Sequence, residues 1–199
     1  MIPTTLLYKE VLSAAAIALT FIAFLPYIRD IKREAVKPHV FSWVIWGSTT
    51  FVVFLAQLAD KGGVGAWPIG VSGLVTIYIA VLAYTRRGDI SITPVDWIFF
   101  VPALSALPLW YVTSDPLWAV VILTGVDLLG FGPTLRKAYA RPFEEQLSLP
   151  VLMSVRNLFA LLALEHYSMT TVLFPALTGL ACLLWIAILM VRRRVVLLG

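Results

Sequence analysis

The chain has 199 residues and a net charge of +4, with 60% hydrophobic and only 13% charged residues. Its mean hydropathy is +0.92, whereas ordinary soluble domains contain about 45 to 50% apolar residues. This composition excludes a water-soluble globular domain, and the single cysteine, Cys182, excludes an intrachain disulfide.

Seven apolar segments follow one another along the chain, each close to the length that crosses a hydrocarbon layer of roughly 30 Å. They are residues 11–28, 40–59, 66–85, 97–113, 117–135, 149–164 and 169–191. Lipid offers no hydrogen-bond partners to backbone groups, so segments of this length must be helical. The sequence therefore predicts an all-α integral membrane protein with seven transmembrane helices.

The first segment has two interpretations. Lys9 precedes it and residues 13–16 are small, as in a cleaved signal peptide. However, the apolar run continues to Ile28, which is longer than the apolar core of a signal peptide, and a basic cluster follows it. We expect this segment to be retained as the first transmembrane helix.

Lysine and arginine side chains gather in alternate connections between the segments. The residues on this face are Arg29, Lys32, Arg33, Lys37, Arg86, Arg87, Arg136, Lys137, Arg141, Arg192, Arg193 and Arg194. The opposite face has only Lys9 and Lys61. The positive-inside rule places the N-terminus outside and the C-terminus in the cytoplasm of a multi-pass protein of the cytoplasmic membrane. Anionic lipid headgroups, rather than nucleic acid, are the expected partners of these loops.

The chain also matches itself when it is shifted by 107 residues, which places Pro26 on Pro133 and Pro68 on Pro175. Near this shift, Ser72 and Gly73 fall on Thr178 and Gly179, and Arg86-Arg87 on Arg192-Arg193. Chance similarity between apolar helices is the alternative. We predict two parallel three-helix repeats, residues 1–88 and 116–199, joined by a linker helix in residues 89–115.

These features resemble the SWEET, SemiSWEET and PQ-loop transporter superfamily over nearly the whole chain. The resemblance rests on Leu25-Pro26-Tyr27-Ile28-Arg29, on Gly132-Pro133-Thr134-Leu135-Arg136, and on residues 38–43, which open the second helix. Tyr27 and Thr134 stand where glutamine follows each proline in the PQ-loop signature. The resemblance implies a three-plus-one-plus-three helix plan. Its members are facilitators and proton-coupled carriers of sugars, amino acids or vitamins, with a sorting-receptor branch.

Asp127 and Arg156 are charges deep inside predicted helices, where an ionisable group costs at least about 2.5 to 3.5 kcal/mol. They lie at matching depth on consecutive helices, so we expect them to pair. The pair is either a permanent structural bridge or a coupling site that opens to a charged solute or a proton. Their repeat counterparts are Thr20 and Thr49.

Polar and aromatic side chains at helical spacing on the predicted helices are candidates for the wall of a solute cavity. They are Thr20, Trp46, Thr49, Thr50, Ser72, Thr76, Met153, Asn157 and Thr178. A packing seam between helices is the alternative, because small and hydroxyl residues also tighten membrane helix contacts. Pro26 and Pro133 are candidate hinges. Trp43 and Trp67 are expected at the membrane interface.

These observations favour a transporter that moves a small polar solute by alternating access between the two repeats. A non-transporting receptor or membrane scaffold is the alternative, and a homo-oligomer is left open. No metal-ligand cluster, cofactor motif or nucleophile motif is present in the sequence, so an enzyme is not expected. Asp115, Glu165 and His166 are expected to form a solvated rim on the outer side.

Overall fold

The computed structural model describes residues 4–35, 38–86, 90, 92, 94–143, 145 and 147–198, without the side chains of 4–6, 95, 96, 133, 137 and 198. These residues form seven α-helices and one 3-10 turn, and contain no β-sheet. The helices are α1 (Thr4–Lys32), α2 (Val40–Ala59), α3 (Trp67–Thr85), α4 (Pro94–Thr113), α5 (Pro116–Ala140), α6 (Ser148–Ala163) and α7 (Met169–Leu198), and the turn is η1 (Gly63–Ala66). The all-α prediction is confirmed.

Five of the helices are long and apolar enough to cross a membrane, which indicates a multi-pass membrane protein. They are α1, α2, α3 together with η1, α5 and α7. The apolar helices described over Trp97–Thr113 and Ser148–Ala163 are shorter. Helix α2 has the predicted bounds, whereas α1, α5 and α7 extend beyond their apolar segments into charged sequence.

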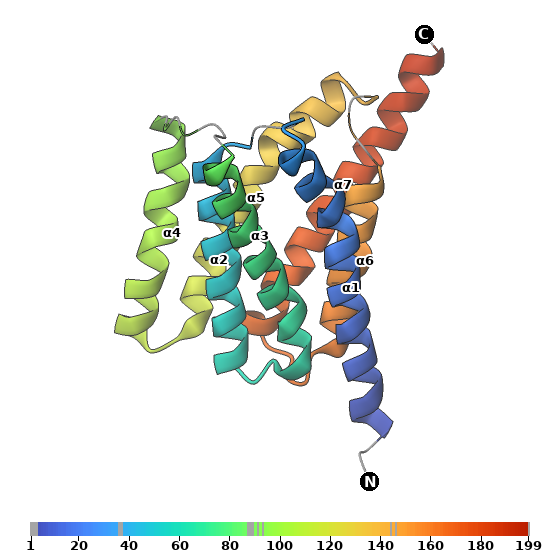
Figure 1. The fold of residues 1–199 in the computed structure, drawn as a ribbon. Coiled ribbons are helices and arrows are strands. Elements are labelled where there is room, and N and C mark those ends of the chain that lie inside the picture. Colours follow the sequence, from blue (N-terminus) through green and yellow to red (C-terminus); the bar gives the residue numbers. More distant parts are fainter. Residues whose placement is uncertain are drawn as a thin grey trace.

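Successive helices alternate in direction, so α1, α3, α5 and α7 run upward in Figure 1 and α2, α4 and α6 run downward. Within the first triplet (α1, α2, α3), α3 packs against both other helices, and in the second triplet (α5, α6, α7) α7 does the same. Between the triplets, α1 packs on α6 and α2 packs on α5. Both triplets therefore have the same helix order and the same direction.

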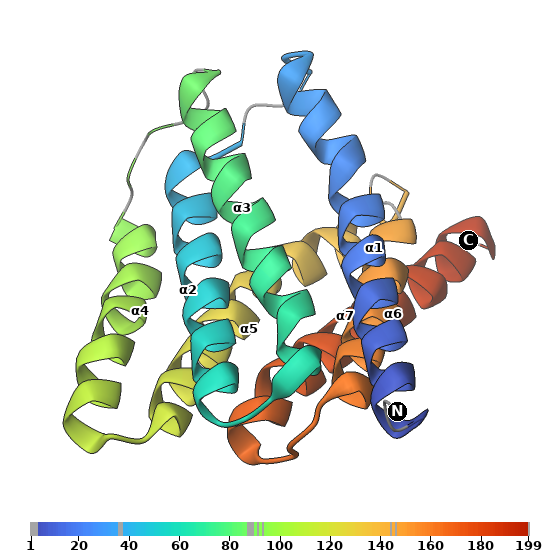
Figure 2. The same ribbon diagram turned by 60° about the horizontal axis from the view of Figure 1, so that its bottom comes forward.

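Helix α4 lies at one edge of the molecule in both ribbon views (Figures 1 and 2). It packs against α5 and α2. Phe41 of α2 contacts the rings of Trp97 and Phe100 across this interface, with centroids 6.4 and 5.2 Å apart. Aromatic contacts thus hold α4 to the outside of the two triplets.

Two glycines bring α2 and α3 into backbone contact. A Cβ atom on Gly47 would lie 2.9 Å from the backbone nitrogen of Ile77, and one on Gly73 would lie 2.9 Å from that of Phe51. These distances leave no room for a side chain, so glycine is required for the close approach.

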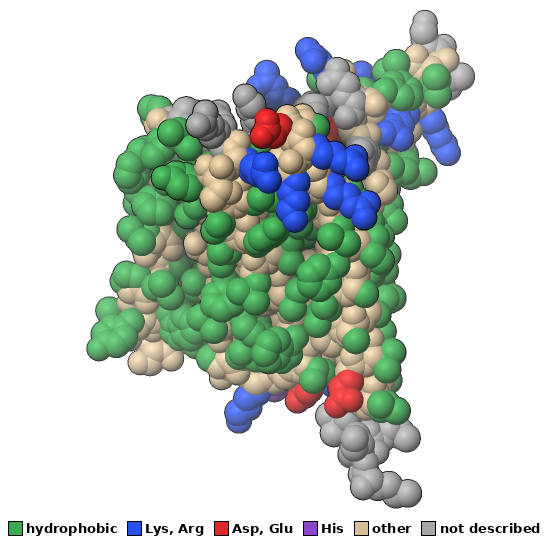
Figure 3. All heavy atoms as spheres, viewed as in Figure 1, with side chains coloured by type: hydrophobic (Ala, Val, Ile, Leu, Met, Phe, Trp, Pro, Cys, Tyr) green, Lys and Arg blue, Asp and Glu red, His purple; other side chains and the backbone are tan. Residues whose placement is uncertain are grey.

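Basic side chains gather at the end of the molecule that is uppermost in Figure 3. At this end lie the C-terminal turn of α1 with Arg29, the end of α3 with Arg86, and the end of α7 with Arg192. We call it the basic end. Lys37 and Arg87, which the predicted charge pattern also includes, lie outside the described residues.

Candidate functional site

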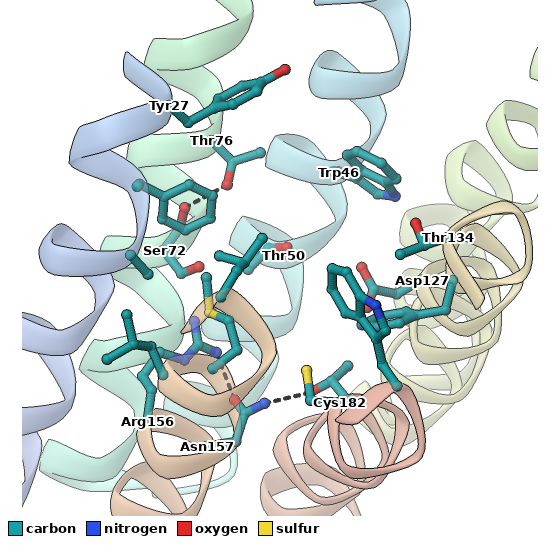
Figure 4. Close-up of a pocket in the computed structure, with 18 of the residues that line it drawn as sticks. Tyr27, Trp46, Thr50, Ser72, Thr76, Asp127, Thr134, Arg156, Asn157 and Cys182 are labelled. Carbon is teal, nitrogen blue, oxygen red and sulfur yellow. Dashed lines mark hydrogen bonds between the residues drawn. The ribbon is translucent and has the colours of Figure 1, made fainter. Parts of the chain in front are cut away.

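A cavity of about 520 Å³ lies between the two triplets, and its wall comes from α1, α2, α3, α5, α6 and α7 (Figure 4). Its apolar wall includes Phe24, Trp43, Trp46, Phe131, Phe174 and Trp185. Its polar wall includes Thr50, Ser72, Thr76, Asp127, Arg156, Asn157 and Thr178. Volumes of about 300 to 1,000 Å³ with a few convergent polar groups are typical of small-molecule sites.

The cavity opens toward the basic end. Asp30, in the last turns of α1, and Ser148, at the first residue of α6, are exposed and belong to its wall. Toward the opposite end, a core that includes Val53, Ala119 and Leu123 fills the space between the helices. The cavity is therefore accessible from one end and closed at the other.

Arg156 is the cation among the described residues of the cavity wall, and it is only 4% exposed. Its Nη2 donates to Asn157 Oδ1 at 2.7 Å, and Asn157 Nδ2 donates to Thr178 Oγ1 of α7 at 3.2 Å. Thr178 in turn donates to the carbonyl of Phe174 at 2.7 Å. This chain of hydrogen bonds holds the guanidinium group in place from two helices.

Asp127 belongs to a different wall of the same cavity, on α5 (Figure 4). The predicted direct contact is absent, because no ion pair joins Asp127 to Arg156 among the described residues. The two helices project the two charges into the cavity from separate sides, and the space between them keeps the side chains apart. A similar expected depth on consecutive helices does not by itself bring two side chains together.

The aromatic side chains of the wall form a connected group near the open end. Tyr27 stacks on Trp43 with ring centroids 5.1 Å apart, and Trp43 meets Trp46 edge-on at 5.7 Å. Phe24 contacts Trp43 from α1 at 6.4 Å. Trp43, which we expected at the membrane interface, therefore also lines the cavity.

Most of the candidate wall residues from the sequence line this cavity. They are Trp46, Thr50, Ser72, Thr76, Met153, Asn157 and Thr178, together with Asp127, Arg156 and Pro26. Thr20 and Thr49 are buried but are not among the lining residues, and their hydroxyls donate to the carbonyls of Ala16 and Trp46 within their own helices. Pro26 lies inside α1. The side chain of the second candidate hinge, Pro133, lies outside the described residues.

The sequence reasoning missed several lining residues, above all Trp185 and Cys182 on α7 and Tyr27 on α1. Cys182 and Trp185 follow Thr178 at helical spacing, about one and two turns further along α7. That spacing was the signal that would have placed them on the same face.

The end opposite the basic end is held shut by what we call the clasp, contacts between residues 60–66 and residues 164–171. Val64 N donates to Glu165 Oε1 at 3.1 Å, and Glu165 N donates to the carbonyl of Gly62 at 3.1 Å. Ser168 Oγ donates to Asp60 Oδ2. The clasp thus joins the α2–α3 connection of the first triplet to the α6–α7 connection of the second.

Helices α1 and α2 add further contacts to the clasp. Lys9 Nζ donates to the carbonyl of Leu164 at 2.6 Å, and Gln57 Nε2 donates to that of Thr171 at 2.7 Å. Glu165 and His166, expected in a solvated rim, take part in these contacts, because His166 Nδ1 lies 3.0 Å from the carbonyl oxygen of Asp60. Asp115 instead accepts from the backbone of Leu117 at 2.9 Å.

Comparison with known proteins adds no relative to this description: no family model, no curated protein and no solved structure matches the chain.

Proposed function

We propose that the protein is a transporter that moves a small polar solute by alternating access between two parallel three-helix repeats. The observation that carries the proposal is the cavity, which takes its wall from every helix of both triplets and is open at one end only. A carrier needs a solute site between two units that can tilt against each other. The described side chains of the linker α4 contribute nothing to this wall.

Equivalent contacts in the two triplets support a duplication. Helix α1 corresponds to α5, and α2 corresponds to α6. The contact of α1 with α6 therefore has an equivalent in the contact of α5 with α2, and both contacts are present. Gly73 of α3 lies against Phe51, and Gly179 of α7 lies against Asn157, where a Cβ would be 3.4 Å from the Asn157 Cβ. Both members of the second pair follow those of the first by 106 residues, in line with the sequence repeat. The resemblance to the SWEET and PQ-loop superfamily is consistent with this plan.

The positive-inside rule assigns the basic end to the cytoplasm, so the cavity in this structure would face inward. The clasp then closes the outer side. A cysteine placed at exposed Lys61, in a Cys182→Ser background, should react with an impermeant maleimide on intact cells. One placed at exposed Arg194 should react only after permeabilisation. The reverse pattern would contradict this orientation.

The transport proposal is tested by locking the clasp. Asp60 and Ser168 are in hydrogen-bond contact across the two triplets, so cysteines at both positions in a Cys182→Ser background are suitably placed to cross-link. Vesicles containing this variant are screened for uptake of labelled sugars, amino acids, organic acids and vitamins. We expect the reduced protein to move at least one solute faster than protein-free vesicles, the oxidised protein to be inactive, and reduction to restore uptake.

The reduced form of the same protein serves as the matched control for folding. Uptake that continues at full rate when the clasp is cross-linked contradicts alternating access. A screen in which the reduced protein moves none of the solutes contradicts transport and favours the receptor or scaffold alternative. A screen with Asp127→Asn tests the coupling role separately, because unchanged uptake in that variant removes it.

A further inference from the structure

The transport proposal leaves the chemical class of the solute undefined, and the cavity wall restricts that class. We infer that the solute carries a carboxylate group, which Arg156 and Trp185 bind in the cavity between the two triplets. This inference rests on the proposed function and concerns the same site.

Arg156 has donor capacity that the protein does not use. Its Nη2 donates to Asn157, but its buried Nε has no hydrogen-bond partner among the described residues. Asn157 is a neutral amide, so the contact leaves the positive charge without a directly bound counter-ion. A buried guanidinium is costly unless an anion pairs with it, and its planar fork matches the two oxygens of a carboxylate.

Trp185 provides a second unused donor in the same wall. Its side chain is 8% exposed, and its indole Nε1 has no hydrogen-bond partner in the part of the chain that the structure describes. A tryptophan N–H that is buried in a membrane protein normally has an acceptor. Both unsatisfied groups of the wall are therefore donors, so the missing ligand group is an acceptor.

The remaining wall favours a compact organic acid over a sugar. A sugar hydroxyl can accept from either donor but brings no negative charge to Arg156, whereas a carboxylate brings both a negative charge and two acceptor oxygens. The rings of Trp46 and Phe131 offer apolar surface to the rest of the molecule. The hydrogen-bond chain through Asn157 and Thr178 fixes the guanidinium before the solute arrives, which reduces the cost of binding.

Asp127 distinguishes two classes of solute that carry a carboxylate, amino acids and simple organic acids. It lines the cavity from α5, on a different wall from Arg156 (Figure 4). An ammonium group on the solute would be attracted to this side chain, so an amino acid would use both charges. A simple organic acid would use Arg156 and Trp185 but not Asp127.

The inference is tested by equilibrium binding to the purified full-length protein, without any transport step. The probes are matched pairs of carboxylate and neutral amide: propanoate and propanamide, 3-phenylpropanoate and 3-phenylpropanamide, and indole-3-acetate and indole-3-acetamide. A charge-assisted hydrogen bond predicts that the carboxylate of at least one pair binds at least about tenfold more tightly than its amide. The inference is overturned if no pair shows this preference.

Variants assign the preference to the two donors. Trp185→Phe keeps an aromatic ring but removes the N–H. It should weaken binding of the carboxylate by about three- to tenfold while leaving binding of the amide nearly unchanged. Trp118→Phe is the matched control, because Trp118 is half exposed and is not part of the cavity wall. Arg156→Gln should abolish the preference for the carboxylate. If the Arg156→Gln protein does not fold, Trp185→Phe still decides the test. An unchanged preference in Trp185→Phe, or in folded Arg156→Gln, contradicts the assignment.

Phenylalanine, compared with 3-phenylpropanoate, then separates the two classes of solute. Tighter binding of phenylalanine that is lost in Asp127→Asn identifies a zwitterionic solute. Weaker binding of phenylalanine identifies a simple organic acid. The carboxylate inference would be overturned, and the transport proposal would stand, if no carboxylate bound but the protein took up a neutral solute and cross-linking of the clasp stopped that uptake.

Discussion

Glycine positions show how single residues determine the helix packing. Gly47 of α2 lies against the backbone of α3, and Gly73 of α3 lies against the backbone of α2. Gly125, on α5, has nothing within 4 Å of where a Cβ would stand. The same substitution should therefore have opposite effects at different glycines.

Gly47→Ala is expected to destabilise the protein by about 1 to 3 kcal/mol, because the added methyl group would meet Ile77 and push the helices apart. Gly125→Ala should leave stability unchanged or raise it by up to about 1 kcal/mol through helix propensity. Reversible unfolding in detergent, followed by circular dichroism, measures both. Equal destabilisation of the two variants would argue against the close α2–α3 contact.

At this scale, the sequence indicated which residues lie at the cavity better than how their side chains contact one another. Hydropathy and helical spacing picked out Arg156, Asn157 and Asp127, which all line the cavity. They did not reveal that Arg156 bonds to the adjacent Asn157 rather than to Asp127, because that choice depends on side-chain rotamers and on the width of the cavity. Trp185 was missed because its neighbours are apolar, although it follows Thr178 by about two helical turns.

The connections between helices are as informative as the helices themselves. The clasp depends on backbone groups of residues far apart in the sequence, and Gly65 of η1 lies so close to α6 that a Cβ would be 2.5 Å from Leu164 N. Gly63 has a positive φ of 63°, a conformation that favours glycine. Adding even a methyl group at these glycines should therefore disturb the clasp.

Gly65→Ala is expected to loosen the clasp, because the methyl group would meet the backbone of Leu164, which cannot move aside as a flexible side chain can. The readout is the rate at which a cysteine in place of the fully buried Thr171 reacts with a thiol reagent in detergent, in a Cys182→Ser background. We expect an increase of at least about fivefold. Gly132→Ala is the control, because Gly132 has nothing within 4 Å of its Cβ position. A rate that is the same in both variants would show that the clasp does not hold this end closed.

The helices as elements were largely predictable. Each predicted apolar segment corresponds to one helix, and five of these helices are long and apolar enough to cross a membrane, where the backbone must satisfy its own hydrogen bonds. The ends of α1, α5 and α7 were not predictable, since helical hydrogen bonding continues beyond the residue at which the apolar run stops. The clasp was unpredictable, because its bonds join connections about 100 residues apart and go mostly to backbone atoms.

The whole molecule combines a cavity open at the basic end with a clasp at the other. If the two triplets are repeats that tilt as units, closing one end and opening the other are a single motion. Both triplets have the same helix order and direction, and the open and closed ends became visible only in three dimensions. Composition cannot reveal them, because they depend on how far apart helices of different triplets lie.

The measurement that tests this account most directly is a pair of distances between spin labels in lipid nanodiscs. One pair of labels replaces exposed Arg29 and Ser148 at the basic end, and the other replaces exposed Lys61 and Tyr167 beside the clasp, both in a Cys182→Ser background. We predict that conditions which lengthen the Lys61–Tyr167 distance, such as adding Gly65→Ala, shorten the Arg29–Ser148 distance in the same population. Two distances that change independently, or a basic end that stays open when the clasp is open, would contradict alternating access.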